Sequence, residues 1–174
     1  MATRGQDRIA DLVDRFLAEG DKALAGSPDW SPGNRDGEMR LSMPVMVKGQ
    51  ASPVHFQITA YPNEATLRFT LTLNWPPCFW RVDFDPPHKR HHNPLKQVAA
   101  LGGAYEVCGP SFHSWADNRH LATPTQLPMK LDCARPLEGK IRTFDAELRW
   151  FCSQTKIKLG PRHGISLPER TQLI

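Results

Sequence analysis

The chain has 174 residues, of which 40% are apolar and 23% are charged. This length suits one domain with its own hydrophobic core, and an aromatic content of 9% argues against a disordered chain. No apolar run approaches the roughly 20 residues of a transmembrane helix, and acidic residues interrupt the N-terminal stretch MATRGQDRIADLVDRF, where an export signal would be apolar. We therefore expect a single α+β domain over 1–160, an extended tail over 161–174, a cytoplasmic location and no membrane partner.

Charge is distributed unevenly along the chain. Residues 1–38 hold 5 Lys or Arg and 8 Asp or Glu, whereas residues 39–174 hold 17 and 10. A basic excess favours an anionic partner such as nucleic acid, although many domains without such a partner are equally basic. The four cysteines (Cys78, Cys108, Cys133 and Cys152) lack the close pairs of a zinc site and are expected to be reduced thiols.

Two apolar stripes with helical spacing predict two helices. The first helix is expected over residues 7–25, with Asp7 at its N-cap, and the second over about 143–157, with Thr143 at its N-cap. Each helix has one apolar face, which predicts that both pack on the same side of a sheet.

Between the two helices the apolar period changes to two, which is typical of strands with one buried face. The alternating segments cover residues 41–47, 54–60, 67–73 and 80–84, and a fifth strand is expected within 104–115. Short connections make these strands an antiparallel sheet of about five strands. Pro44 cannot donate to a ladder, so it indicates either an edge strand or an interruption in the first strand.

Five of the seven histidines lie between residues 88 and 120, and acidic residues lie close to them in the sequence. Imidazoles titrate near neutral pH, and a base, an acid and an Arg are the groups that phosphodiester hydrolysis needs. The catalytic candidates are His88, His92, His113, His120, Asp117 and Arg119. Alternation also places Asp83 and Asp85 on one face of a strand, where they would bind a divalent metal ion together with His88 and His92.

The histidine segments also have a simpler interpretation, because PPHKRHHNP has the composition of a solvated basic loop. His88 and His92 are four residues apart, a spacing that aligns ligands only on a helix, and the flanking prolines argue against a helix there. The sequence matches no two-histidine phosphoesterase, His-Asn-His nuclease, P-loop or nucleophile-elbow pattern. Both interpretations stay open on the sequence alone.

Basic residues near the histidines and in the tail are candidates for contacts with nucleic acid phosphates. These residues are Arg81, Lys89, Arg90, Lys156, Lys158 and Arg162. Interleaved Trp and Arg residues, such as Trp80 with Arg81, would also suit stacking on a single strand if the rings lay on the wet face of the sheet. Alternation instead places Trp80 on the apolar face.

Three segments resemble a small uncharacterised family of bacterial and phage proteins: CFWRVDFDPPHKRHHNP (78–94), CGPSFHSWADNRHLATP (108–124) and ARPLEGKIRTFDAELRWFC (134–152). The resemblance covers about the last two-thirds of the chain and assigns no catalytic residue. It implies a prokaryotic or mobile-element setting, in which small proteins cut nucleic acid or bind and block a host defence or toxin component. We therefore expect a nucleic-acid-directed module with a His/Asp phosphodiesterase site of nuclease or toxin type. The alternatives are a non-enzymatic inhibitor that binds a protein partner and a structural or accessory phage protein.

Overall fold

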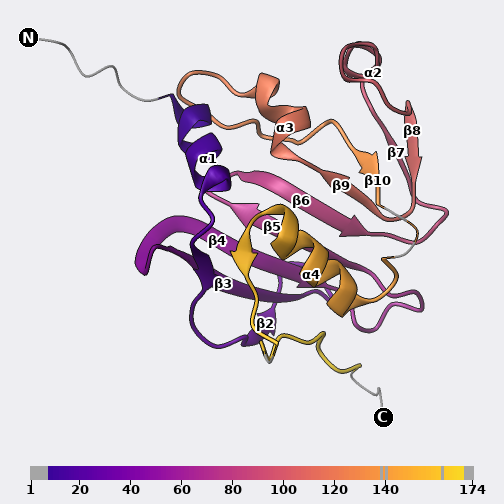
Figure 1. The fold of residues 1–174 in the computed structure, drawn as a ribbon. Coiled ribbons are helices and arrows are strands. Elements are labelled where there is room, and N and C mark those ends of the chain that lie inside the picture. Colours follow the sequence, from indigo (N-terminus) through magenta and orange to yellow (C-terminus); the bar gives the residue numbers. More distant parts are fainter. Residues whose placement is uncertain (1–7, 138, 140, 162, 171–174) are drawn as a thin grey trace, which may run out of the picture.

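A computed structural model describes residues 8–137, 139, 141–161 and 163–170. Its centre is a nine-stranded sheet in the order β10-β9-β6-β5-β4-β3-β1-β11, with β2 paired to β3 (Figure 1). All of its strand pairs are antiparallel except β1 with β11. The strands are β1 (Lys22–Leu24), β2 (Trp30–Pro32), β3 (Met39–Val47), β4 (Gln50–Ala60), β5 (Phe69–Asn74), β6 (Cys78–Phe84), β9 (Ser111–His113), β10 (Arg135–Pro136) and β11 (Ile157–Lys158). The predicted α+β class with a mostly antiparallel sheet is confirmed.

The predicted number of about five strands is wrong. The four alternating segments are β3 to β6, which form the expected meander, but β1, β2, β10 and β11 have only two or three residues each. Such short strands hold too few side chains to show a period of two. Pro44 lies inside β3, an internal strand, where the register with β4 shifts between Pro44 and Met46. The interruption alternative therefore describes Pro44, and the edge alternative is wrong.

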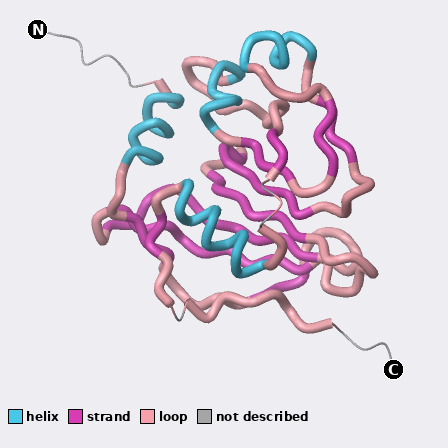
Figure 2. The backbone as a smooth tube through the Cα atoms, turned by 45° about the vertical axis from the view of Figure 1, so that its right-hand side comes forward, coloured by secondary structure: helices cyan, strands magenta, loops and turns pink. Residues whose placement is uncertain are grey.

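The helices also differ from the predicted pair, one at each end of the chain. Four α-helices occur among the described residues: α1 (Ile9–Ala18), α2 (Leu95–Leu101), α3 (Trp115–Asn118) and α4 (Phe144–Gln154). A 3₁₀ turn, η1 (Arg119–Leu121), directly follows α3. Only α4 lies across the face of the central strands, as Figures 1 and 2 show, and Thr143 caps it by accepting a hydrogen bond from the Ala146 amide at 3.2 Å. The long helix α1 packs instead near the start of β6, where the Phe16 and Phe79 rings lie 5.8 Å apart.

The first helix is shorter than predicted because Lys22 ends it. The ammonium group of Lys22 is fully buried and donates to the backbone oxygens of Phe16, at 2.7 Å, and of Glu19, at 2.5 Å. The same group lies 4.9 Å from the centre of the Phe16 ring. A cation at the C-terminal end of a helix satisfies carbonyl groups that have no partner in the helix, so the chain leaves the helix and continues as β1. The predicted cap residue Asp7 lies outside the described residues.

A second, two-stranded sheet stands apart from the first. It is a hairpin of β7 (Arg90–His92) and β8 (Glu106–Cys108), and the connection between these two strands contains α2. The fifth predicted strand is therefore divided, because β8 belongs to this hairpin and β9 to the main sheet. None of the described helices has the length and apolar character needed to cross a membrane. In the predicted tail, the indole of Trp30 donates to the Ser166 oxygen at 2.9 Å, so this part of the chain packs back on the domain.

Candidate functional site

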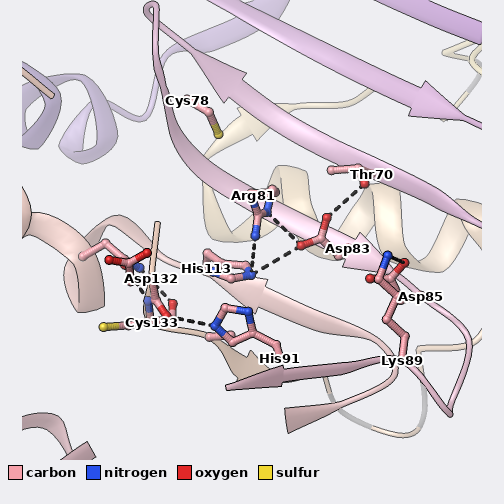
Figure 3. Close-up of polar contacts among 12 residues, drawn as sticks. Thr70, Cys78, Arg81, Asp83, Asp85, Lys89, His91, His113, Asp132 and Cys133 are labelled. Atoms are coloured by element: carbon pink, nitrogen blue, oxygen red, sulfur yellow. Dashed lines mark hydrogen bonds and ion pairs between the residues drawn. The ribbon is translucent and has the colours of Figure 1, made fainter. Parts of the chain in front are cut away.

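A polar cleft of about 250 Å³ lies between the β7–β8 hairpin and the sheet face that α4 does not cover (Figure 3). Its position follows from alternation in β6. Trp80 and Val82 face the core on the α4 side, so Arg81 and Asp83 face the cleft. The charged and imidazole side chains that line it are Arg68, Arg81, Asp83, Asp85, Lys89, Arg90, His91 and His113.

Strand register brings the central residues of the cleft together. His113 in β9 is the register partner of Arg81, and Asp83 lies between Ser111 on one side and Thr70 on the other. Cross-strand partners have side chains only about 5 Å apart. Residues more than 30 positions apart in the sequence therefore contact each other directly.

Asp83 is a carboxylate with several partners. Its Oδ2 lies 2.8 Å from Nε of Arg81 and 3.4 Å from Nε2 of His113, and its Oδ1 accepts a hydrogen bond from Thr70 at 3.0 Å. Burial alone would raise the pKa of Asp83, but the contacts with His113 and Arg81 hold that pKa at about 2. Asp83 is therefore negatively charged throughout the physiological pH range.

The imidazole of His113 is buried and neutral. Burial and the charge of Arg81 lower the pKa of His113, although Asp83 opposes this. Arg81 Nη2, which can only donate, lies 2.8 Å from Nε2 of His113, and this contact is shorter than the one to Asp83. Nε2 of His113 therefore lies between Arg81 and Asp83, and its Nδ1 is buried with no hydrogen-bond partner among the described residues.

His91 completes the site from the hairpin side. Its ring meets the His113 ring edge to face, with centroids 4.9 Å apart. Nε2 of His91 lies 2.9 Å from the backbone oxygen of Asp132, which can only accept, so this nitrogen carries a proton. In the neutral ring Nδ1 then carries the lone pair, and among the described residues nothing hydrogen-bonds to it. A backbone carbonyl that fixes the tautomer in this way leaves a base directed at a cleft.

The predicted metal ligands are only partly brought together. Asp83 and Asp85 both line the cleft, whereas His88 and His92 do not. Asp85 pairs with Arg68 at 3.2 Å and with Lys89 at 3.6 Å. No group of three or more His, Cys, Asp or Glu side chains suited to a metal ion occurs in the part of the chain that the structure describes. The predicted divalent metal therefore has no assembled ligand set among these residues.

Five of the six predicted catalytic residues lie away from the cleft: His88 and His92, as described above, and Asp117, Arg119 and His120. Asp117 is bound by Arg135, with contacts of 2.6 and 2.8 Å, and accepts from the Ser114 hydroxyl at the start of α3. Arg119 pairs with Asp11 and Asp14, which fixes α3 and η1 to α1, and His120 is exposed in η1. The structure places Asp117 and Arg119 in contacts between elements, so His113 alone of the six predicted catalytic residues lines the cleft.

The predicted phosphate contacts are divided in the same way. Arg81, Lys89 and Arg90 line the cleft or its rim. Lys156 donates to the backbone oxygen of Ala18, and Lys158 pairs with Asp21 at 2.6 Å, both near the end of α1. Arg162 lies outside the described residues.

The four thiols are poor nucleophiles. Burial raises the pKa of Cys78 and of Cys152 to about 12, and the pKa values of Cys108 and Cys133 are raised as well. Since the thiolate is the reactive form, and no thiol lines the cleft, none of the four is a candidate nucleophile for chemistry there.

Sequence reasoning missed His91 and Arg68 as site residues. His91 lies between His88 and His92, which were selected, and alternation within β7 turns it towards the cleft while His92 faces away. Recognising RHH as a strand would have identified it, but three residues show no period. Arg68 precedes β5 and pairs with Asp85.

No family model, no curated protein and no solved structure matches this chain. The function therefore has to be argued from the chemistry of the cleft itself.

Proposed function

We propose that the cleft binds a phosphodiester and hydrolyses it by general base catalysis, with His91 as the base. The observation that carries this proposal is the pair of imidazoles in a cleft with four cationic side chains. His91 is held so that its Nδ1 is an acceptor, and His113 contacts it from the buried side. Nucleic acid is the phosphodiester that best fits a basic protein of this size.

Each polar residue of the cleft has a defined part in this reaction. Arg81, Lys89 and Arg90 offer N–H groups to the phosphate oxygens, where negative charge builds up in the transition state. A water molecule attacks phosphorus and gives its proton to Nδ1 of His91. The P–O bond to the leaving group breaks, and solvent at the cleft mouth protonates the departing oxygen. His113 and Asp83 are positioning residues, because they hold Arg81 and the His91 ring in place.

The test compares His91→Ala with His88→Ala, an exposed histidine three positions away that does not line the cleft. The substrates are bis(4-nitrophenyl) phosphate and labelled single-stranded RNA and DNA. General bases contribute about 100-fold or more to a rate, so His91→Ala should lose at least that factor while His88→Ala stays within twofold of the wild type. Equal rates for the two variants, or no hydrolysis by the wild type, would refute the proposal.

One observation favours the alternative of a non-enzymatic interaction protein. On the opposite face of β9, next to α4, a groove of about 520 Å³ is lined by the rings of Phe112 and Trp150 and by Arg135 and Gln154. Grooves of this size with aromatic walls accept small molecules or the apolar side chains of a partner. If the wild type hydrolyses no phosphodiester, this groove becomes the better guide to function.

A further inference from the structure

The β7–β8 hairpin has a second face that the proposed reaction does not use. His91 and Val107 are register partners on the cleft side, so His92 and Glu106, the next pair, face away from the cleft. On this outer face the ring of Tyr105 stacks on the ring of His92, with centroids 5.2 Å apart and 29° between the planes. Tyr105 is 51% exposed, so much of its ring is open to solvent.

A chain of polar contacts connects this ring pair to the cleft. The carboxylate of Glu106 accepts from Nε2 of His92 at 3.1 Å and from Nη1 of Arg90 at 3.3 Å. Arg90 also lies at the rim of the cleft. Glu106 uses one guanidinium nitrogen of Arg90, which leaves the other N–H groups of that side chain for a ligand. An open ring and a cation are therefore held on one surface that begins at the proposed reaction centre.

The other tyrosine among the described residues has different surroundings. Tyr61 has the guanidinium of Arg68 over its ring, at 4.5 Å from the centroid, and its hydroxyl donates to Glu38 at 3.0 Å. The Tyr105 ring stacks on His92, and no described residue hydrogen-bonds to its hydroxyl. An isolated exposed aromatic ring is common on protein surfaces, but here a second ring and a neighbouring cation accompany it.

We infer that the ligand of this protein is a single-stranded nucleic acid, with one base stacked on Tyr105 and the adjacent phosphate bound by Arg90. The inference names the substrate class of the proposed reaction and depends on that proposal only for the cleavage step. Aromatic rings bind the face of any base, whereas the bases of a duplex are stacked on each other and offer no free face. Binding should therefore be sequence-tolerant and selective for single strands.

The experiment measures the affinity of the full chain for a labelled single-stranded oligonucleotide of about 12 nucleotides, within the usual size of such sites, by fluorescence anisotropy at fixed salt. Loss of one base–ring contact costs a factor of about 5 to 100 in affinity. Tyr105→Ala should show this loss and Tyr105→Phe should retain the affinity within twofold. Leu95→Ala is the matched control, since Leu95 is 71% exposed on the neighbouring helix and has no ring. The same sequence as a duplex should bind more weakly and should not respond to Tyr105→Ala.

Two results would overturn the inference: wild-type affinity in Tyr105→Ala, or equal binding of duplex and single strand. Hydrolysis of bis(4-nitrophenyl) phosphate separates this outcome from failure of the proposed reaction. If His91 is needed for that hydrolysis but Tyr105→Ala binds oligonucleotides normally, the reaction stands and the stacking contact is refuted. If Tyr105→Ala weakens binding while the wild type cleaves nothing, the stacking contact stands and the reaction is refuted.

Discussion

Two carboxyl groups, the partly buried Asp83 and the fully buried Glu147, lie on opposite sides of the central sheet and have opposite surroundings. Asp83 faces the cleft, where Arg81, Thr70 and His113 contact it. Glu147 lies on α4, between Phe144 and Phe151, whose rings pack on β5 and β6. It is fully buried, and neither of its oxygens has a hydrogen-bond partner among the described residues.

These surroundings shift the two pKa values in opposite directions. Asp83 has a pKa of about 2 because its contacts outweigh burial, whereas burial and the charge of Asp83 raise the pKa of Glu147 to about 8. The comparison shows that partners, more than depth, decide the charge of a buried acid in this fold. At neutral pH, Asp83 in the cleft is therefore ionised, and Glu147 in the core is mostly protonated.

The largest effect is expected from removing the paired charge. Asp83→Asn leaves Arg81 beside a neutral amide, and breaking a buried pair costs about 3–5 kcal/mol. The Arg81 side chain is 33% exposed, which places the expected loss near the lower end of that range. Urea denaturation followed by tryptophan fluorescence measures it, with the exposed loop carboxylate variant Asp36→Asn as the control. A loss no greater than that of the control would contradict the pairing that we describe.

The unpaired acid should behave in the opposite way. At pH 7 the folded protein binds a proton at Glu147 that the unfolded chain releases, and a pKa of about 8 against 4.5 corresponds at this pH to a cost of about 3 kcal/mol. Glu147→Met should therefore raise the free energy of unfolding by about that amount. Gln154→Met, on the exposed side of the same helix, should change it by less than about 0.5 kcal/mol. Destabilisation by Glu147→Met would mean that its carboxyl has a favourable contact in solution.

The pH dependence of stability sharpens the comparison. The pKa of Glu147 is raised on folding, so proton binding at Glu147 stabilises the folded state fully below pH 4.5. This stabilisation is lost as the pH rises towards 8, by up to about 1.4 kcal/mol per pH unit. The pKa of Asp83 is lowered, so its contribution is present above pH 3.8 and is lost as the pH falls towards 2. Urea midpoints measured from pH 5 to 8 should fall less steeply for Glu147→Met than for the wild type. Parallel curves would refute this assignment.

The smallest effect is expected where a paired acid is exposed. Asp14 accepts from Arg119 and from the Trp115 indole, and its side chain is 40% exposed. Exposed ion pairs contribute little to stability, so Arg119→Ala should shift the urea midpoint far less than Asp83→Asn does. Phosphodiester hydrolysis should be unchanged, because Arg119 lies outside the cleft. A loss of hydrolysis in a folded Arg119→Ala protein would restore Arg119 as a candidate catalytic residue.

The sequence predicted elements well where apolar side chains recur with a regular period. It predicted them poorly where contacts between distant residues determine where an element begins or ends. Alternation predicted β3 to β6, and Thr143 predicted the start of α4 to the residue, although the helix ends at Gln154, three residues before the predicted end. The end of α1 depends on Lys22, whose ammonium group contacts carbonyl groups of the preceding helix, and no local pattern announces that contact. Strands of two or three residues form because neighbours offer them hydrogen-bond partners, so their own sequences carry little signal.

The candidate site was predictable only as a region. Asp83, Asp85 and His113 were selected from composition and do line the cleft, but His91 acquires its position from a three-residue strand in a separate hairpin. Asp117 and Arg119 attracted attention as polar residues next to His113, yet their contacts hold α3 to β10 and α1. Polar residues that join elements and polar residues that face a cleft have the same composition, and only the fold separates them.

The buried ammonium group of Lys22 has a practical consequence. Burial lowers its pKa to about 8, so a fraction of the amine is unprotonated under mildly alkaline conditions, yet no reagent can reach it while α1 is in place. Acylation of this one amine, located by peptide mass mapping, should therefore proceed only when the N-terminal helix detaches. Its rate relative to that of the exposed Lys48 would report how often the folded chain opens at that end.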